Sequence, residues 1–360
     1  MKILVAGEWA WPWHERACAD ALTKLGHKVQ RFSWMDRFRY VRNGDVEPRY
    51  ISKYKEIQNR ITYGPSVFAL NADLLKAVKE FQPEVLFVYR ATHIFPRTLR
   101  IIKQIFPATK LVQYCNDDPF SPKANKIYWR HLKCAIPLYD INFVYRYQNV
   151  DDFKKHGAKQ VKLLRSYYIA ERNYPVKLGI QDQRFMCDVV FAGHYEADFR
   201  VEYLEAIVKE GFKLNLFGFG GGWNNVRIAL SSNSPLQELY PISPAIDEDY
   251  RKVLSGAKIT LCFLSKINRD TYTRRNFEIP ATGAFMLSEY SDDLATLFEE
   301  GIEAEFFRSK KEMLNKIRYY LSLDEKRREI SRRGRERVMR DGHDVVARMI
   351  QMVKQCEKVL

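Results

Sequence analysis

The chain contains 360 residues, of which 46% are hydrophobic and 14% aromatic, and its formal net charge is +15. This length predicts two domains, and the aromatic content excludes an intrinsically disordered chain. The charge is uneven: residues 1–180 contain 31 basic and 16 acidic side chains, whereas residues 181–360 contain 28 of each. A nucleic-acid-binding protein that is basic over its whole surface is therefore not expected, and the two halves are predicted to have different partners.

The six cysteines are widely separated and form no C-x-x-C pair, so neither a disulfide framework nor a zinc site is predicted. This usage is typical of a reducing compartment. No apolar run approaches the roughly 18 residues of a membrane-spanning helix, and the N-terminus lacks the apolar core of a signal peptide. We therefore expect a cytoplasmic protein.

Strands and helices are predicted to alternate along the first half. The apolar run 2–7 ends in Gly7 and predicts a buried parallel strand, and a second strand is predicted after Gly26. Further strands are predicted at 84–89, 110–115 and 140–145, and helices at 14–25, 71–80 and 96–105. Such alternation is typical of a parallel sheet with helices on both faces.

A polar stretch around 166–183 interrupts this pattern, which then resumes. Strands are predicted at 187–193, 213–223, 257–264 and 284–289, and helices at 198–210, 275–282 and 309–355. We therefore predict an α/β protein of two doubly wound, Rossmann-like domains that face a cleft. The predicted parts are residues 1–170, a linker at 171–186, residues 187–342, and a C-terminal helix at 343–360 that crosses back to the first domain.

Ligands of open parallel sheets bind beyond the carboxyl ends of the strands. Gly7 and Gly193 occupy such positions, one in each domain, but neither belongs to a G-x-G-x-x-G fingerprint. The glycine-rich segment 217–223 shows no sign of a following helix, so it is either a flexible connection or a loop that approaches a ligand.

The segment 263–290 contains the largest number of candidate site residues. Asp270 and Glu278 lie eight residues apart among four cations, Lys266, Arg269, Arg274 and Arg275. Cations and exposed helix amides suit a diphosphate, and a carboxylate near a helix start can accept hydrogen bonds from sugar hydroxyls. A charged surface loop that caps a helix explains the same composition equally well.

Several blocks of the second half resemble the C-terminal half of the CgeB-like (spore maturation protein) glycosyltransferases. These blocks are DVVFAGHYEADFR (188–200), ITLCFL (259–264), RRNFEIPATGAFMLSEYSDDL (274–294), GIEAEFFRSKKEMLNKIRYYL (301–321) and RERVMRDGHDVVARM (335–349). In residues 1–170 the resemblance rests on the order of elements and on YCNDDP (114–119). This family is related to glycosyltransferase family 4, so the resemblance implies the GT-B fold and transfer of a sugar from a nucleotide.

The family's E-x7-E element falls on Asp270 and Glu278. The resemblance implies that Glu278 binds the ribose of the donor and that Asp270 contacts the transferred sugar. The side chain of Asp270 is shorter than that of the family's glutamate. The turn between them, Thr271, Tyr272 and Thr273, is implied to hold the phosphates.

The resemblance implies further donor contacts. The family's Arg and Lys after the first strand of this domain correspond to a region that offers His194 and Arg200, with Lys266 in place of the missing lysine. Of the adjacent pair Arg274 and Arg275, only one can face a cleft, and we expect this to be Arg275. The stretch 240–250, which includes Ile242, matches the seat of the nucleotide base.

The first half is expected to bind the acceptor. His93, Asp117 and Asp118 follow predicted strands, so they are candidates for the base that activates an acceptor hydroxyl. Capping and turn formation explain the same three residues. Near Glu8 and His14, tryptophans 9, 11 and 13 either stack on a sugar or pack beneath the loop.

We therefore predict a glycosyltransferase that moves a sugar from a nucleoside diphosphate, UDP or GDP, to an unidentified acceptor, with retention of anomeric configuration. No metal is expected, and no cofactor is expected besides the donor. The excess positive charge predicts an acidic acceptor or peripheral contact with an anionic membrane, and nucleic acid is not an expected partner. The alternatives are a nucleotide-sugar epimerase on the same fold and a non-catalytic protein that binds nucleic acid or an anionic membrane.

Overall fold

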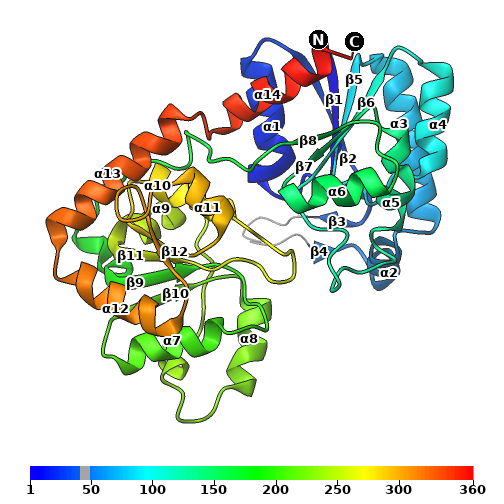
Figure 1. Cartoon of the computed structure of the whole chain (residues 1–360). Helices are drawn as coiled ribbons and strands as arrows, with labels where there is room; N and C mark the ends of the chain where they lie inside the picture. The colour runs from blue at the N-terminus through cyan, green and yellow to red at the C-terminus, as the bar shows by residue number, and fades with distance from the viewer. Residues whose placement is uncertain (41–48, 360) are drawn as a thin grey trace. The chain divides into compact units, whose positions relative to one another are not determined.

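The structure, a computed structural model, describes residues 1–40 and 49–359 (Figure 1). The chain forms two compact units. Unit 1 comprises Met1–Ser166 and Val345–Leu360, and unit 2 comprises Tyr167–Asp344. The charge follows this division, because unit 1 contains 32 basic and 16 acidic residues whereas unit 2 contains 27 and 28.

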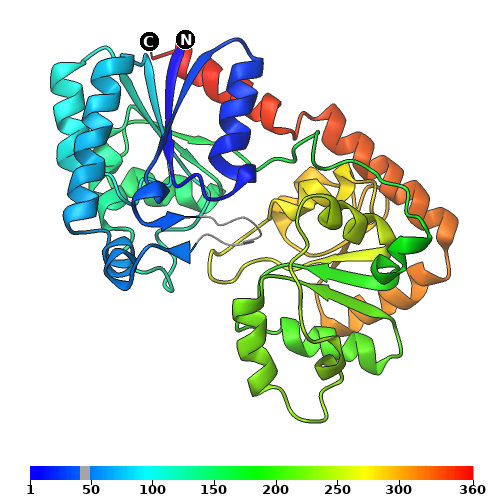
Figure 2. The same ribbon diagram turned by 180° about the vertical axis from the view of Figure 1, so that it is seen from behind.

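Unit 1 is built on a parallel sheet of six strands in the order β2-β1-β5-β6-β7-β8. The strands are β1 (Lys2–Gly7), β2 (Lys28–Ser33), β5 (Val85–Tyr89), β6 (Lys110–Cys115), β7 (Ile141–Val144) and β8 (Val161–Leu163). Every residue of β5 and of β7 is buried, which fits continuous apolar runs covered on both faces. Figures 1 and 2 show helices on both faces of this sheet.

Helices accompany the strands of unit 1. They are α1 (Ala17–Lys24), α2 (Lys53–Ile61), α3 (Pro65–Phe81), α4 (Pro96–Ile105), α5 (Arg130–Ala135), α6 (Tyr147–Lys155) and α14 (Val345–Glu357). Helix α14 packs against α1, so the predicted return of the C-terminal helix to the first domain is confirmed. Two short antiparallel strands, β3 (Arg39–Tyr40) and β4 (Arg49–Tyr50), precede α2.

Unit 2 is built on a parallel sheet of five strands in the order β10-β9-β11-β12-β13. The strands are β9 (Cys187–Ala192), β10 (Leu214–Phe217), β11 (Ala257–Cys262), β12 (Met286–Glu289) and β13 (Glu305–Phe307). The helices are α7 (Arg200–Lys209), α8 (Gly220–Ala229), α9 (Glu248–Gly256), α10 (Arg275–Ala281), α11 (Asp292–Leu297), α12 (Lys310–Leu321) and α13 (Asp324–Arg340).

Two features of unit 2 differ from the sequence prediction. The stretch 171–186 lies inside unit 2, where Phe185 is buried and Asp182 pairs with Lys252 of α9 at 3.2 Å. The glycine-rich segment also continues into a helix, α8. The helix was not predicted because glycine has a low helix propensity. The buried Trp223 anchors it, since the indole Nε1 donates to the carbonyl oxygen of Gly193 at 3.0 Å.

Within the described ranges, no helix combines the length and the hydropathy needed to span a bilayer.

Candidate functional site

The carboxyl end of β9 in unit 2 forms a crowded turn at Gly193. A Cβ atom at this position would lie 2.7 Å from Cζ of Phe191 and 3.2 Å from Nη1 of Arg275. The carbonyl oxygen of Gly193 is occupied by the Trp223 indole. A larger residue would therefore press first on the Phe191 ring and then on the Arg275 guanidinium, and glycine avoids both contacts.

Arg275, the first residue of α10, extends its guanidinium over the Phe191 ring, 5.8 Å from the ring centroid. Its Nη2 donates to the carbonyl oxygen of Phe263 at 3.4 Å, whereas its Nε is buried and has no hydrogen-bond partner. Burial lowers the pKa of Arg275, but the nearby Cys262, Tyr250 and Glu278 raise it overall, so the side chain stays charged. A buried N–H of a charged group that has no protein partner is suited to an external anion.

Glu278 lies in the first turn of α10, as predicted, and is held from two sides. The Tyr250 hydroxyl donates to Oε2 at 2.9 Å, and Nε of Arg274 lies 3.2 Å from Oε1. Burial, followed by the charge of Glu278, raises the pKa of Tyr250 well above its ordinary value. The phenol therefore remains a donor throughout the physiological pH range and fixes the orientation of the carboxylate.

His194 follows Gly193 and stacks on Phe219 at a centroid distance of 5.5 Å. Burial lowers its pKa, and the charges of Arg275 and Arg274 lower it further. The imidazole is therefore neutral near pH 7 and can serve as a hydrogen-bonding group beside the two guanidiniums.

Arg200 does not occupy the position predicted for a donor ligand. It is only 2% exposed, and its guanidinium forms a bidentate pair with Asp198, with Nε–Oδ1 and Nη2–Oδ2 distances of 2.8 Å. Its Nη1 also donates to the carbonyl oxygen of His194 at 2.6 Å. The predicted direct contact is corrected: Arg200 holds the loop that carries His194.

The predicted phosphate turn uses its side chains internally. Thr271 Oγ1 donates to Oδ2 of Asp293 at 2.7 Å, and Tyr272 is fully buried against Phe277. The backbone N–H of Thr273 donates to Oδ1 of Asn276 at 2.8 Å. These contacts stabilise the turn, and the implied role of the turn in holding the phosphates stays a prediction.

The remaining candidates of unit 2 differ in exposure. Ile242 is buried in the apolar core, so its side chain is not available to a nucleotide base. The carbonyl oxygen of the next residue, Ser243, accepts the backbone N–H of Gly218 at 3.0 Å. Lys266 is exposed and forms an ion pair with Glu289. Asp270 is half-buried in the loop after β11 and donates its backbone N–H to the Ser265 carbonyl oxygen at 2.8 Å.

In unit 1, the space beside Gly7 is filled by Glu15. A Cβ atom at Gly7 would lie 2.3 Å from Oε1 of Glu15, and this oxygen accepts the backbone N–H of Glu8 at 2.9 Å. Burial, and secondarily the charge of Glu8, raises the pKa of Glu15 to about 7. The predicted donor contact at Gly7 is corrected, because a carboxyl group occupies the place of a phosphate.

A chain of ion pairs lies at the same edge of the sheet. Glu8 Oε1 lies 3.1 Å from Nη1 of Arg39, Glu8 Oε2 lies 3.7 Å from Nη1 of Arg90, and Arg90 Nη2 lies 2.7 Å from Oδ2 of Asp117. The Nε atoms of Arg39 and Arg90 and the indole Nε1 of Trp9 are buried without hydrogen-bond partners. Trp9 and Arg90 also have positive φ angles of 60° and 66°, a strain that is typical of functional sites.

His93 and Asp118 are internal. His93 is 1% exposed between Trp34 and Phe38, and burial lowers its pKa to about 3. Asp118 is equally buried, and its Oδ1 accepts the N–H of Phe120 at 3.0 Å and the amide of Asn149 at 2.9 Å. The prediction that His93 or Asp118 is the catalytic base is therefore wrong, because a substrate hydroxyl cannot reach either side chain.

Sequence reasoning missed Arg39 and Arg90, and it included Tyr250 only within the stretch 240–250, without its contact with Glu278. Arg90 directly follows an apolar strand, which is a usable signal for a residue at a sheet edge. Arg39 and Tyr250 gave no such signal, because their roles depend on contacts with Glu8 and Glu278, which are distant in the sequence.

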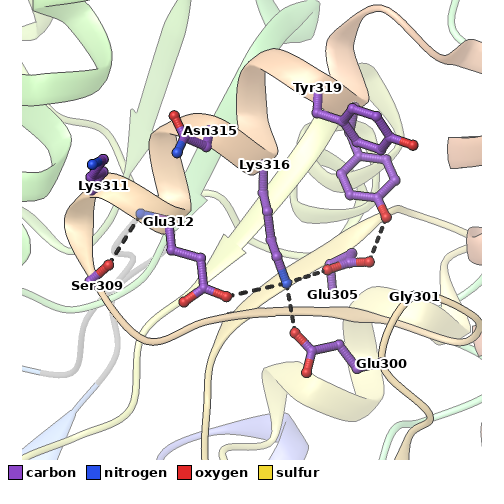
Figure 3. Close-up of a pocket in the computed structure, with 10 residues that line it drawn as sticks. Glu300, Gly301, Glu305, Ser309, Lys311, Glu312, Asn315, Lys316 and Tyr319 are labelled. Carbon is purple, nitrogen blue, oxygen red and sulfur yellow. Dashed lines mark hydrogen bonds and ion pairs between the residues drawn. The ribbon is translucent and has the colours of Figure 1, made fainter.

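In the part of the chain that the structure describes, no group of three or more His, Cys, Asp or Glu residues is arranged to hold a metal ion. A cavity of about 530 Å³ in unit 2 is lined by residues of α12 and by Glu300, Gly301 and Glu305 at the start of β13 (Figure 3). Its Lys316 is surrounded by Glu300, Glu305 and Glu312.

Residues 200–354 match a family model described as glycosyl transferase-like. This range includes Arg275, Glu278 and Tyr250 but covers less than half of the chain. No curated protein matches the chain in sequence.

Solved structures match over the whole chain. Sucrose-phosphate synthase from Thermosynechococcus elongatus is 15% identical, with a TM-score of 0.68 over 100% of this chain and 99% of that one. HepE from Anabaena, solved with UDP and glucose, is 12% identical, with a TM-score of 0.68 over 99% and 100%. α,α-Trehalose 6-phosphate synthase from Burkholderia multivorans is 12% identical, with a TM-score of 0.65 over 99% and 98%. The chain has the GT-B fold.

The predicted fold class is thus confirmed for this GT-B protein. Together with the family match, the fold supports a glycosyltransferase that binds a nucleotide sugar. The finer resemblance to the CgeB-like proteins stays a prediction.

Proposed function

We propose that this GT-B protein transfers a hexose from a nucleoside diphosphate, UDP or GDP, to an acceptor hydroxyl, and that it belongs among the CgeB-like enzymes. The observation that carries this proposal is the cluster of Arg275, Glu278 and Tyr250 at the carboxyl edge of the second sheet, inside the range that matches glycosyltransferases. The similar protein HepE was solved in complexes with UDP and with UDP-glucose, which favours UDP as the nucleotide.

In the proposed reaction, the bond between the anomeric carbon and the diphosphate oxygen breaks and a bond to the acceptor oxygen forms. The buried Arg275 binds the diphosphate and stabilises the negative charge that develops on the departing nucleotide. Glu278, oriented by Tyr250, accepts hydrogen bonds from the ribose hydroxyls, and Asp270 contacts the transferred sugar. The roles of Glu278 and Asp270 rest on the CgeB-like resemblance.

The acceptor is proposed to bind at the carboxyl edge of the unit 1 sheet. Of the three carboxylate and imidazole candidates, Asp117 is the one that is partly exposed, at 26%. We assign to it the orientation or deprotonation of the acceptor hydroxyl, with Arg90 fixing the carboxylate.

We also propose that transfer needs no metal ion and retains the anomeric configuration. The positive charge for the leaving group would come from Arg275, with His194 as a neutral hydrogen-bonding group. Activity that survives EDTA, and an α-linked product from an α-linked donor, are the expected results.

Thermal-shift titration with UDP-, GDP-, TDP- and ADP-sugars tests the donor site. One nucleotide should stabilise the protein, by about 2.7 kcal/mol at a concentration 100 times Kd. Glu278→Ala should abolish this shift, whereas Glu336→Ala, a substitution on the exposed surface of α13, should preserve it. A protein that no nucleotide sugar stabilises, or a Glu278→Ala variant that responds like the parent, would contradict the proposal.

A further inference from the structure

Helix α2 of unit 1 exposes its apolar side chains and buries its polar ones. Tyr54, Ile57 and Ile61 share one face and are 41% to 59% exposed, whereas Gln58 and Asn59 are buried. The buried amides are satisfied, because Gln58 Oε1 accepts the backbone N–H of Ser66 at 2.8 Å and Asn59 donates to the Tyr50 hydroxyl at 3.0 Å. The exposed apolar face is therefore a stable feature of the fold.

Neighbouring segments extend this face. Tyr63 and Phe68, both about half exposed, pack edge to face at a centroid distance of 5.0 Å. The Arg130 guanidinium donates to the carbonyl oxygens of Ile127 (2.9 Å) and Thr62 (3.2 Å), which places the exposed Ile127 beside the end of α2. We define the apolar corner as seven residues: Ile51, Tyr54, Ile57, Ile61, Tyr63, Phe68 and Ile127.

The charges around the apolar corner are almost all positive. Residues 49–68 and 121–130 contain seven basic side chains and one acidic one, Glu56, which pairs with Arg60 at 2.7 Å. Lys53, Lys123 and Lys126 are exposed beside the corner. Unit 1 as a whole carries the excess positive charge of the chain.

We propose that the apolar corner is a docking surface for an anionic phospholipid membrane. Large apolar side chains beside lysines are the composition of a helix that lies in the headgroup region. A protein partner would also fit an apolar face, but the one-sided positive charge favours a surface of uniform negative charge.

The corner lies at the end of unit 1 where β1 and β5 finish (Figure 1). It is also linked to the ion-pair chain, since the Tyr50 hydroxyl that receives Asn59 of α2 also receives Nη2 of Arg39 at 2.7 Å. Docking would therefore present the edge that carries Glu8, Arg90 and Asp117 to the membrane surface. The membrane proposal itself does not depend on the proposed function, because vesicle binding is measured without donor or acceptor.

Co-sedimentation of the full chain with vesicles tests the proposal. We expect binding to phosphatidylcholine vesicles that contain about 30 mol% phosphatidylglycerol, weaker binding at high salt, and little binding to phosphatidylcholine alone. The triple variant Tyr54→Ser/Ile57→Ser/Ile61→Ser should bind at least about tenfold more weakly. Ile105→Ser, an equally exposed position on α4, is the matched control and should bind like the parent.

The charges are tested by Lys53→Glu/Lys126→Glu, which should weaken binding about tenfold or more, against Lys28→Glu/Lys79→Glu, which alters exposed lysines elsewhere in unit 1. Hydrogen exchange in residues 51–68 should slow when anionic vesicles are added. Equal losses in the test and control variants, or no binding to anionic vesicles, would overturn the proposal. A dimer that forms without vesicles and that the triple variant abolishes would also overturn it, in favour of a second copy of the chain.

Discussion

The hydroxyl of Tyr250 in α9 donates a hydrogen bond of 2.9 Å to Oε2 of Glu278 in α10. The two residues are 28 positions apart in the sequence, and Arg274 holds the other carboxylate oxygen. The carboxylate is therefore oriented before any ligand arrives. This preorganisation lowers the entropy cost of binding for whatever hydroxyl groups it receives.

Tyr250→Phe should weaken donor binding by about three- to tenfold, because the hydrogen bond that orients the Glu278 carboxylate is lost while the carboxylate itself remains. Glu278→Gln should weaken it by about 10- to 100-fold, because a charged acceptor is lost. Calorimetric titration with the nucleotide found by thermal shift measures both. A larger effect from Tyr250→Phe than from Glu278→Gln would contradict the view that the tyrosine acts through the glutamate.

Gly193→Ala should disturb Arg275 while leaving the fold intact. The new Cβ would lie 2.7 Å from the Phe191 ring and 3.2 Å from Nη1 of Arg275, so both must shift, at a cost of about 1–3 kcal/mol. We expect a lower melting temperature together with weaker nucleotide binding. Gly211→Ala, at a turn with open space but a φ of +83°, is the control for lost stability: backbone strain should lower its melting temperature while its nucleotide affinity stays unchanged. Unchanged nucleotide affinity in Gly193→Ala would place the diphosphate elsewhere.

Asp117→Asn should lower kcat by about 10²- to 10⁴-fold if Asp117 serves as the base, and should leave the affinity for the donor nucleotide unchanged. The matched control is Asp73→Asn, which removes an exposed carboxylate that pairs with Arg37 in the same unit. Equal activity of the two variants would remove Asp117 from the reaction.

The fold was largely predictable because the central strands of both sheets are buried runs that are rich in apolar residues, such as 2–7 in the first sheet and 187–192 in the second. Short elements such as β13 and α11 lack such runs and were not predicted. For the candidate site, the position of Glu278 in the first turn of a helix could be predicted from the pattern of residues 263–282, whereas its role rests on the resemblance. The internal roles of Arg200, His93 and Asp118 could not be predicted, because a charged or polar residue in the segment after a strand gives the same sequence pattern whether its partners lie in the protein or in a ligand.

Glu15 should make the stability of the protein depend on pH. Its folded-state pKa of about 7 lies above its ordinary value because of burial, so the folded protein holds the proton more tightly than the unfolded chain. Its contribution is complete below about pH 4.5 and is lost as the pH rises through 7, a change of about 3 kcal/mol. Glu15→Gln keeps an acceptor for the Glu8 N–H, so it should flatten this dependence and melt at a higher temperature than the parent at pH 8. Parallel curves for the two proteins between pH 5 and 8 would contradict the assignment.

Lys316 should contribute strongly to the stability of unit 2. Its Nζ lies 2.6 Å from Glu300, 2.6 Å from the buried Glu305 and 3.5 Å from Glu312 (Figure 3). Lys316→Met would leave the Glu305 carboxylate buried without this countercharge, which costs about 3 kcal/mol or more. We therefore expect a melting temperature lower by roughly 6 °C or more, whereas Lys311→Met, at an exposed position of the same helix, should have little effect.

The pH dependence distinguishes this charge effect from a loss of packing. Hydrogen bonds from Arg308, and the nearby Lys316, lower the pKa of Glu300 to about 2, so this carboxylate stabilises the parent above about pH 4.5 and the contribution is lost as the pH falls through 2. In Lys316→Met, protonation of the carboxylates relieves their repulsion, so the difference in melting temperature from the parent should shrink between pH 7 and pH 3. A difference that stays constant over this range would mean that the lysine acts through its aliphatic chain.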